Sequence, residues 1–200
     1  MRNLKNFKPR IYRNANISLI INFLFVEIYV LRLGHRRERD KRVATHCALV
    51  SRAFLAKKMY YSGEKDQLLE EKIKKVNETF GGEFSVEYVE DWKRLIKEFQ
   101  GLRVHLTMYG IPLVNKLEEI KKNERILAIV GSTKVPKEVY FLSDMNIAIT
   151  NQPHSEIAAL AIFLDKIHEE REFFSEFSNA KIKIIPSERG KKVMRLSHQS

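Results

Sequence analysis

The chain has 200 residues, 44% of them hydrophobic, which suffices for one α/β domain and excludes a largely disordered protein. Lys and Arg number 36 against 25 Asp and Glu, and the net charge of +11 indicates a polyanionic partner such as nucleic acid or a solvated basic surface. A single cysteine, Cys47, excludes an internal disulfide framework and favours a cytoplasmic protein.

The first 25 residues are predicted to be an extension outside the domain. They carry five basic residues and no acid, and they end in the apolar run 17–25, so they resemble a signal peptide. However, no small-residue cleavage site follows, and Glu27 ends the apolar run before it reaches bilayer-spanning length. We expect an upstream start codon to account for residues 1–25, with a membrane anchor as the less favoured alternative.

From residue 26 onward, short β-rich runs alternate with helical patterns. Strands are predicted at 26–33, 58–61, 84–89, 103–108, 125–130, 145–150 and 180–185. Helices are predicted at 42–57, 66–80, 92–99, 135–142 and 155–168, with another that Pro112 starts. The unbroken apolar run 125–130 suits a parallel strand that is buried on both faces. We therefore expect one α/β domain, residues 26–200, with an open, mostly parallel sheet and helices on both faces.

The helix predicted at 42–57 has an apolar pattern that assigns Val43, Leu49, Ala53 and Phe54 to its buried face. Cys47 lies among small residues of the same helix, so it is interpreted as a packing residue rather than a nucleophile.

Several common catalytic motifs are absent. The sequence contains neither a G-x-G-x-x-G fingerprint after the first strand nor a G-x-x-x-x-G-K-[ST] phosphate loop, which disfavours an enzyme that uses a nicotinamide cofactor or ATP. The six histidines and the one cysteine lack metal-site spacing, so no metal is expected. No G-x-S-x-G motif of a serine hydrolase is present either.

Polar and charged segments follow several predicted strands, where loops of a parallel sheet converge on a ligand. Six basic residues fall within residues 32–42, a pattern that suits an RNA backbone, although Glu38 and Asp40 could pair with them in a solvated loop. The candidate RNA contacts are Arg32, Arg36, Arg37, Arg39 and Lys41. Residues 106–112 are interpreted first as an ordinary turn, although their polar groups and glycine could open backbone amides to a ligand. Residues 131–136 and 149–156 are rich in hydroxyls and amides, which suit an adenine and a ribose better than a triphosphate. Ser155 is expected to cap the helix that follows.

The order and the residues of these segments resemble those of the archaeal tRNA (cytidine-56) 2′-O-methyltransferases of the SPOUT superfamily. The matching segments are 31–36, 39–42, 105–112, 134–136, 152–156 and 185–190. The resemblance covers about five-sixths of the chain, and residues 1–25 have no counterpart in it. It implies a homodimer, a deep C-terminal trefoil knot with a short β extension, and cytidine 56 in the T loop of tRNA as the target.

The resemblance also implies that S-adenosylmethionine binds in the knot. The residues carried over as its contacts are Leu106, Gly131, Ser132, Thr133, Lys134, Val135, Ile149, Thr150, Asn151, Gln152, Pro153, His154, Ser155 and Glu156. Thr133 stands where relatives have a glutamate, so a charged contact at that position is in doubt.

An arginine is expected to stabilise the ribose alkoxide that develops during methyl transfer, because a guanidinium stays protonated. The candidates are Arg42 first, then Arg39 and Arg36, with His46 as an orienting neighbour or a buried hydrogen-bonded residue. The basic residues of segment 181–195 either extend an RNA track or keep the tail soluble. The alternatives are a SPOUT enzyme for another RNA site or base, and a non-catalytic RNA-binding protein of the same fold.

Overall fold

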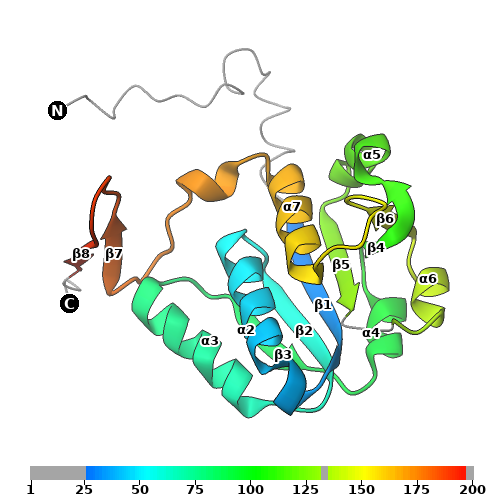
Figure 1. Ribbon diagram of the computed structural model, residues 1–200, viewed down its shortest axis with the longest axis horizontal. Coiled ribbons are helices and arrows are strands. Elements are labelled where there is room, and N and C mark those ends of the chain that lie inside the picture. Colours follow the sequence, from blue (N-terminus) through cyan, green and yellow to red (C-terminus); the bar gives the residue numbers. More distant parts are fainter. Residues whose placement is uncertain (1–25, 132–134, 197–200) are drawn as a thin grey trace.

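The computed structural model describes residues 26–131 and 135–196, which form a sheet domain followed by a small hairpin (Figure 1). Six parallel strands form the main sheet in the order β3-β2-β1-β5-β4-β6. Their bounds are β1 Glu27–His35, β2 Lys58–Gly63, β3 Ser85–Tyr88, β4 Leu102–Pro112, β5 Arg125–Gly131 and β6 Met145–Ala148. This arrangement confirms the predicted parallel α/β sheet.

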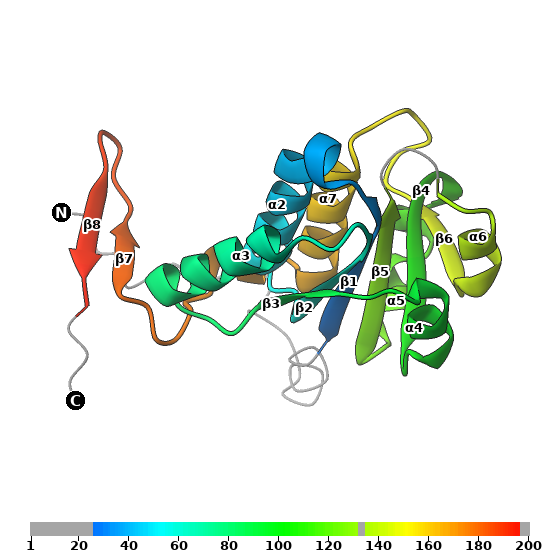
Figure 2. The ribbon, with the colours of Figure 1, turned by 90° about the horizontal axis from the view of Figure 1, so that it is seen from below.

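Helices cover both faces of the sheet, as the alternation of elements predicts. The larger hydrophobic cluster includes side chains of α2 (Arg37–Ala53), α3 (Gln67–Phe80), α5 (Leu117–Lys121) and α7 (Glu156–His168). The smaller cluster lies on the other face, under α4 (Trp92–Glu98) and α6 (Glu138–Leu142). Figure 2 shows α2, α3 and α7 grouped on one side of the strands. No helix within the described residues is long and apolar enough to cross a membrane.

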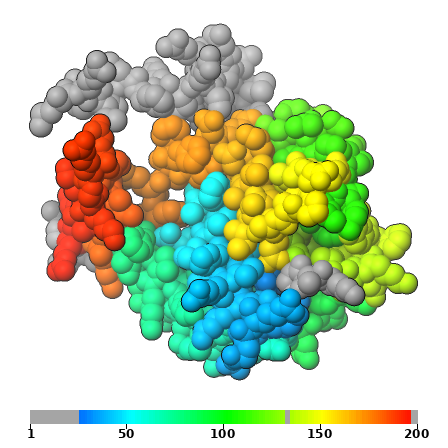
Figure 3. Space-filling model, in the orientation of Figure 1, coloured from blue at the N-terminus to red at the C-terminus, as the bar shows by residue number. Residues whose placement is uncertain are grey.

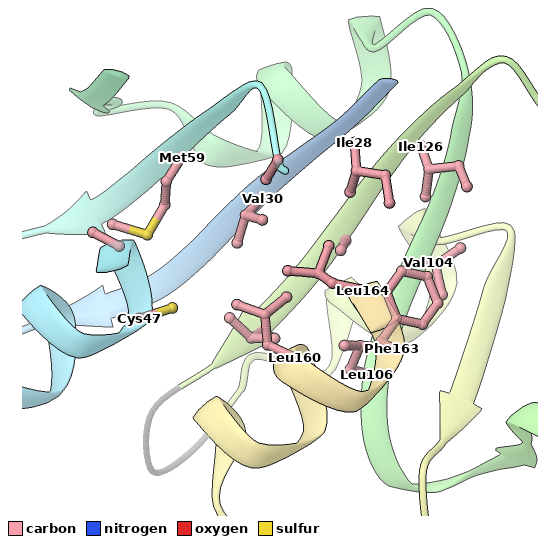
Figure 4. Close-up of a cluster of buried hydrophobic side chains, with 14 of the residues drawn as sticks. Ile28, Val30, Cys47, Met59, Val104, Leu106, Ile126, Leu160, Phe163 and Leu164 are labelled. Atoms are coloured by element: carbon pink, nitrogen blue, oxygen red, sulfur yellow. The ribbon is translucent and has the colours of Figure 1, made fainter. Parts of the chain in front are cut away.

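The two central strands are apolar on both faces. Along β5, Ile126, Ala128 and Val130 belong to the larger cluster, whereas Leu127 and Ile129 belong to the smaller one. Successive side chains of a strand point to opposite faces, so the unbroken apolar run reports double burial, as predicted. Figure 4 shows the larger cluster, in which side chains of β1, β4 and β5 meet the apolar side chains of α7.

Helix α2 begins at Arg37, not at residue 42, and it buries a different face from the one predicted. Asp40 accepts a hydrogen bond from the backbone N–H of Arg36 at 3.1 Å, which satisfies a donor at the helix start. The buried face consists of small residues, among them Ala44, Cys47 and Ser51. Val43 and Leu49 are 37% and 36% exposed, Ala53 is exposed and Phe54 is half-buried. The predicted burial of Val43, Leu49 and Ala53 is therefore wrong.

Two further helices start later than predicted, each after a proline. Pro112 is the last residue of β4, and a 3-10 turn, η3 (Leu113–Asn115), separates it from α5. Helix α6 begins at Glu138 rather than at Val135, since Pro136 disfavours a helical conformation in the residue before it.

The C-terminal part of the chain contains more structure than the pattern predicts. After the 3-10 turn η4 (Arg171–Phe174), the predicted strand is β7 (Ile182–Ile185), and it pairs with an antiparallel partner, β8 (Lys192–Arg195). The prediction treated the residues of β8 as a basic tail. The predictions for residues 1–25, and those for Ser132, Thr133 and Lys134, lie outside the described residues.

Burial of His168 predicts that stability falls in mild acid. The imidazole is 4% exposed, and burial, assisted by the charge of Arg171, lowers the pKa of His168 from 6.5 to about 4. A histidine with a lowered folded-state pKa stabilises the fold above its unfolded-state pKa, and this contribution is lost as the pH falls from 6.5 towards 4. Between pH 7 and pH 4, the free energy of unfolding should fall by about 3 kcal/mol more than in His168→Gln. Urea unfolding across this range measures the difference, and parallel curves for the two proteins would contradict it.

Candidate functional site

The carboxyl ends of the parallel strands bring the candidate segments to one edge of the sheet. Leu33 of β1 pairs with Gly131 of β5, so residues 34–42 begin beside the segment that starts at Gly131. Residues 111–112 of β4 pair with residues 147–148 of β6, which places segment 149–156 beside the end of β4. Segments that lie far apart in the sequence therefore surround one edge, as expected for a ligand site in an open α/β sheet.

Arg32 lies beneath this edge and is fully buried. Its Nε donates to Oε1 of Glu156 at 2.9 Å, and its Nη2 lies 3.9 Å from Oδ2 of Asp40. Glu156 is the first residue of α7, and Asp40 lies in the first turns of α2. Burial raises the pKa of Glu156, against the opposing charge of Arg32. The pair thus joins the starts of two helices that carry candidate site segments.

Burial removes Arg32 from the surface set predicted to contact RNA. A phosphate contact requires accessible N–H groups, and this guanidinium has none at the surface. The burial of Arg32 could not be predicted from the local sequence, because its carboxylate partner, Glu156, lies 124 residues away in the chain. Arg32 is an internal ion-pair residue in this structure, and the correction leaves the other basic candidates in place.

The remaining basic residues of the segment form the first turns of α2. Oδ2 of Asp40 accepts hydrogen bonds from the backbone N–H and the Nε of Arg36, at 3.1 and 3.3 Å. Burial opposes ionisation of Asp40, but these hydrogen bonds and the charge of Arg32 outweigh it and hold the pKa of the carboxyl below its usual value. The side chains that are exposed in this segment belong to Arg37, Arg39, Lys41 and Arg42.

Arg39, Arg42 and His46 share one exposed face of α2. Their spacings of three and four residues place them in line along a helix, opposite the buried Ala44 and Cys47. Within the described residues, Arg39 and Arg42 form no ion pair at their guanidinium groups. His46 is exposed, so its interpretation as a buried histidine is wrong. Burial raises the pKa of the Cys47 thiol to about 12, which supports a packing role and excludes a thiolate nucleophile.

Two neutral segments are fastened together beside these arginines. Nδ2 of Asn151 donates to the carbonyl oxygens of Met108 at 2.7 Å and Gly110 at 3.0 Å. Gly110 packs directly on the backbone of β6, since a Cβ there would lie 2.5 Å from atoms of Asn146 and Ile147. These contacts bend the end of β4 and hold its carbonyl groups against segment 149–156. Neither contact was identified from the sequence, although the glycine at a strand end was a signal for a close backbone approach.

A buried network of polar side chains connects β4 to β6 and α6 near the same end of β4. Nδ1 of His105 lies 2.9 Å from Oδ1 of Asn146, and Nδ2 of Asn146 donates to the carbonyl oxygen of Tyr140 at 2.9 Å. The hydroxyls of Thr107 and Tyr140 lie 3.1 Å apart. Burial lowers the pKa of His105, which keeps the imidazole neutral. This network was missed, because His105 occurs within an otherwise apolar strand and its partners lie far away in the chain.

The other predicted contacts take three kinds of position. Leu106 is buried in the larger hydrophobic cluster, whereas Thr150, Gln152, Pro153, His154 and Ser155 are exposed. Ile149 is half-buried, and so are Gly131 and Val135, which lie on either side of residues 132–134. Ser155 accepts a hydrogen bond from the backbone N–H of Ile157 at 3.2 Å, which confirms the predicted cap.

The arrangement is suited to hold a neutral heterocycle and to stabilise a developing anion beside it. The loops at the edge offer backbone groups, hydroxyls and amides, while α2 offers exposed guanidinium groups at the same edge. Among the described residues, no group of three or more His, Cys, Asp or Glu side chains is placed to hold a metal ion.

The sequence is similar to a known enzyme family. A model of the family described as "tRNA ribose 2′-O-methyltransferase, aTrm56" matches residues 80–194. The tRNA (cytidine(56)-2′-O)-methyltransferase of Archaeoglobus fulgidus is 57% identical over 169 residues, which cover 84% of this chain and 99% of the relative. The protein of the same name from Methanopyrus kandleri is 50% identical over 170 residues, which cover 84% of this chain and 96% of the relative.

Solved structures share the fold. The SpoU methyltransferase AviRb from Streptomyces viridochromogenes, in complex with AdoMet, aligns with a TM-score of 0.53 at 13% identity over 74% of this chain. An AdoMet-bound rRNA methyltransferase from Sinorhizobium meliloti aligns with a TM-score of 0.53 at 17% identity over 76%. The chain spans 58% of the length of each of these structures. At this level of identity the likeness concerns the fold alone.

Proposed function

The chain belongs to the aTrm56 family of tRNA ribose 2′-O-methyltransferases, and on that premise we propose that it methylates the 2′-hydroxyl of cytidine 56 in the T loop of tRNA, with S-adenosylmethionine as the methyl donor. The observation that carries the proposal is the meeting of an arginine-bearing helix start with neutral, amide-rich loops at one sheet edge. We also propose a cytoplasmic location, which a tRNA substrate supports.

The residues at the edge fit an S-adenosylmethionine site. The Asn151 bridge holds the end of β4 against segment 149–156, so the backbone groups of both are preorganised to receive an adenine and a ribose. We assign the cofactor contacts to Leu106, to segment 131–135 and to segment 149–156. When bound, S-adenosylmethionine supplies an activated methyl group.

The arginines of α2 are proposed to act on the RNA. A ribose hydroxyl becomes a good nucleophile only as its proton leaves, so a cation beside the oxygen lowers the barrier. Arg42 is our first candidate because it is exposed and free of carboxylate partners in the described structure, and Arg39 is the next. Arg36 comes last, since Asp40 already engages it. Arg37, Arg39 and Lys41 are proposed to bind the neighbouring phosphates.

A homodimer is proposed to complete the site. Helices α2 and α7 pack side by side and form part of one face of the molecule (Figure 3). Val43 and Leu49 of α2 and Ile162 of α7 are 37%, 36% and 44% exposed. Burial of these apolar side chains against a second copy would bring the arginines of one subunit towards the donor site of the other. We also propose that the chain from β5 to α7 forms the trefoil knot of the superfamily.

Asn151→Ala is expected to weaken the binding of S-adenosylmethionine by about tenfold. The variant removes both hydrogen bonds to the end of β4, each worth about 1 kcal/mol, without touching the arginines. Isothermal titration calorimetry measures the affinity, and Asn123→Ala provides the control, because its Nδ2 also donates to two backbone carbonyl groups, those of Glu119 and Ile120, but it lies just before the start of β5, outside the proposed cofactor site. An unchanged affinity in Asn151→Ala would contradict the assignment of this bridge to the cofactor site.

The proposed function is tested by locating the methyl group that the protein adds. After reaction of an unmodified tRNA with S-adenosylmethionine, nuclease digestion and mass spectrometry should find one methylated cytidine whose 3′ phosphodiester resists cleavage. Base methylation leaves that phosphodiester cleavable, so this outcome would replace ribose methylation with base methylation. Binding of tRNA without methyl incorporation would instead favour a non-catalytic RNA-binding protein.

A further inference from the structure

The hairpin β7–β8 is separate from the main sheet, and its strands are largely uncovered. It forms a two-stranded sheet of its own, and Figure 2 shows it beyond the end of α3, away from the other strands. All four residues of β8 are exposed. The paired residues Ile184 and Val193 are 62% and 63% exposed. An isolated two-stranded hairpin is at best marginally stable in water, so its retention in this form calls for an explanation.

The hairpin is strongly basic. Residues 181–195 contain six basic side chains and one acidic one, Glu188. The basic residues are Lys181, Lys183, Arg189, Lys191, Lys192 and Arg195. Lys183 forms an ion pair with Glu176, whereas the others form no ion pair within the described residues. A ribbon with this charge is matched to a polyanion, and two copies of it would repel one another.

The base of the hairpin is firmly fixed to the end of α3. Arg52 donates from Nη2 to the carbonyl oxygens of Phe80 and Gly81, at 3.2 and 2.6 Å. Its guanidinium also lies over the ring of Phe177, 4.3 Å from the ring centre. The Arg52 side chain is almost completely buried, so these bonds are shielded from water. A buried arginine thus clamps together the end of α3 and the chain that leads to β7.

Two glycines permit this close attachment. Gly81 and Gly82 both have positive φ angles, and a Cβ on Gly82 would lie 2.7 Å from the Phe177 ring. The backbone N–H of Gly82 donates to the carbonyl oxygen of Ser178 at 2.8 Å, and that of Lys181 donates to Thr79 at 3.0 Å. The base of the hairpin is therefore held by specific contacts, whereas its two strands are largely exposed.

We propose that the hairpin β7–β8 is a second tRNA-binding surface, which grips the sugar-phosphate backbone at a distance from the methylated nucleotide. Helix α3 has 14 residues and is about 21 Å long, and its last turn, not its first, carries the hairpin. The hairpin therefore lies at the opposite edge of the domain from the arginines of the same chain. Basic and apolar side chains are cross-strand neighbours on both faces of the hairpin, as in the pairs Ile182–Arg195 and Lys183–Met194, a combination that suits the wide, shallow groove of an RNA stem. This inference rests on the proposed tRNA substrate.

The test compares two variants, one that neutralises three charges on the hairpin and one that neutralises three charges elsewhere. The hairpin variant is Lys191→Gln/Lys192→Gln/Arg195→Gln, and the control is Lys72→Gln/Lys74→Gln/Lys75→Gln on the exposed surface of α3. All six side chains are exposed, and both variants lose the same net charge. Fluorescence titration of the full-length dimer with unmodified tRNA, from 50 to 300 mM salt, gives each affinity and its salt dependence.

The hairpin variant should bind tRNA at least about tenfold more weakly, and the slope of log affinity against log salt should fall by about 2 to 3. The control should bind like the unaltered protein, and kcat at saturating tRNA should be the same in all three. Equal losses in both variants would overturn the proposal in favour of a general charge effect. Unchanged tRNA binding with loss of the dimer in ultracentrifugation would overturn it in favour of a protein contact. Failure of the unaltered protein to methylate tRNA would count against the proposed function, not against the hairpin.

Discussion

Arg42→Ala is expected to lower kcat for tRNA methylation by about 10²- to 10³-fold, the range found when a group that stabilises a transition-state charge is removed. The guanidinium is exposed on α2 and has no carboxylate partner within the described residues, so it is available to an RNA oxygen. Because it lies on the surface, its removal should leave folding and S-adenosylmethionine affinity unchanged. Single-turnover rates at saturating tRNA and saturating donor measure the chemical step directly.

Arg37→Ala is the matched control for this prediction. Arg37 is an exposed arginine at the start of the same helix, but our proposal gives it only a phosphate contact. Its loss should raise the KM for tRNA and leave kcat nearly unchanged, since that contact is equally strong in the ground state and the transition state. A normal kcat in Arg42→Ala would contradict the assignment and transfer the role to Arg39.

Mixed dimers extend the same prediction to the shared site. If the arginine of one subunit serves the donor site of the other, Arg42→Ala mixed with an inactive donor-site variant should recover about a quarter of the normal activity. Each mixed dimer then contains one intact site. Absence of recovery, with subunit exchange verified, would contradict a site shared between subunits.

Arg32→Met is expected to lower the free energy of unfolding by about 3–5 kcal/mol, because it leaves the buried Glu156 carboxylate without its partner. Arg36→Met breaks a half-exposed ion pair with Asp40 and should cost only about 0–1 kcal/mol. Urea unfolding at pH 7 compares the two variants. Equal losses in the free energy of unfolding would contradict the prediction that the buried ion pair of Arg32 matters more than the ion pair of Arg36.

The double variant Arg32→Met/Glu156→Gln separates an unpaired charge from lost packing. Removing the carboxylate along with its partner should restore most of the stability that the single variant loses. Without Arg32 the pKa of Glu156 should rise further, so the loss in Arg32→Met should shrink as the pH falls towards the ordinary glutamate value of 4.5. A loss that stays constant with pH would show that packing, rather than charge, is responsible.

Local patterns predicted those parts of the fold that depend on neighbouring residues. The apolar run of β5 indicated a strand that is buried on both faces. Ser155 indicated the start of α7, and the glycines after Phe80 indicated the end of α3. In each case the determining interaction lies within a few residues of the signal. The convergence of the candidate segments at one edge was also predictable, because the carboxyl ends of parallel strands lie at the same edge of a sheet.

Interactions between distant segments account for what was missed. Arg32 resembles its basic neighbours in the sequence, but Glu156 holds it in the interior. Val43 and Leu49 follow a helical apolar pattern, but they are exposed, because α2 packs into the protein through its small residues instead. Strand β8 contains basic residues with only two apolar ones, and it becomes a strand because β7 pairs with it.

The central claim is that the 2′-hydroxyl of cytidine 56 receives the methyl group. The most direct measurement is tritium transfer from labelled S-adenosylmethionine to an unmodified tRNA transcript, beside the same transcript that already carries 2′-O-methylcytidine at position 56. Label is expected in the first transcript only. Label in both transcripts would place the reaction at another site, and label in neither, with tRNA binding intact, would contradict the enzymatic function.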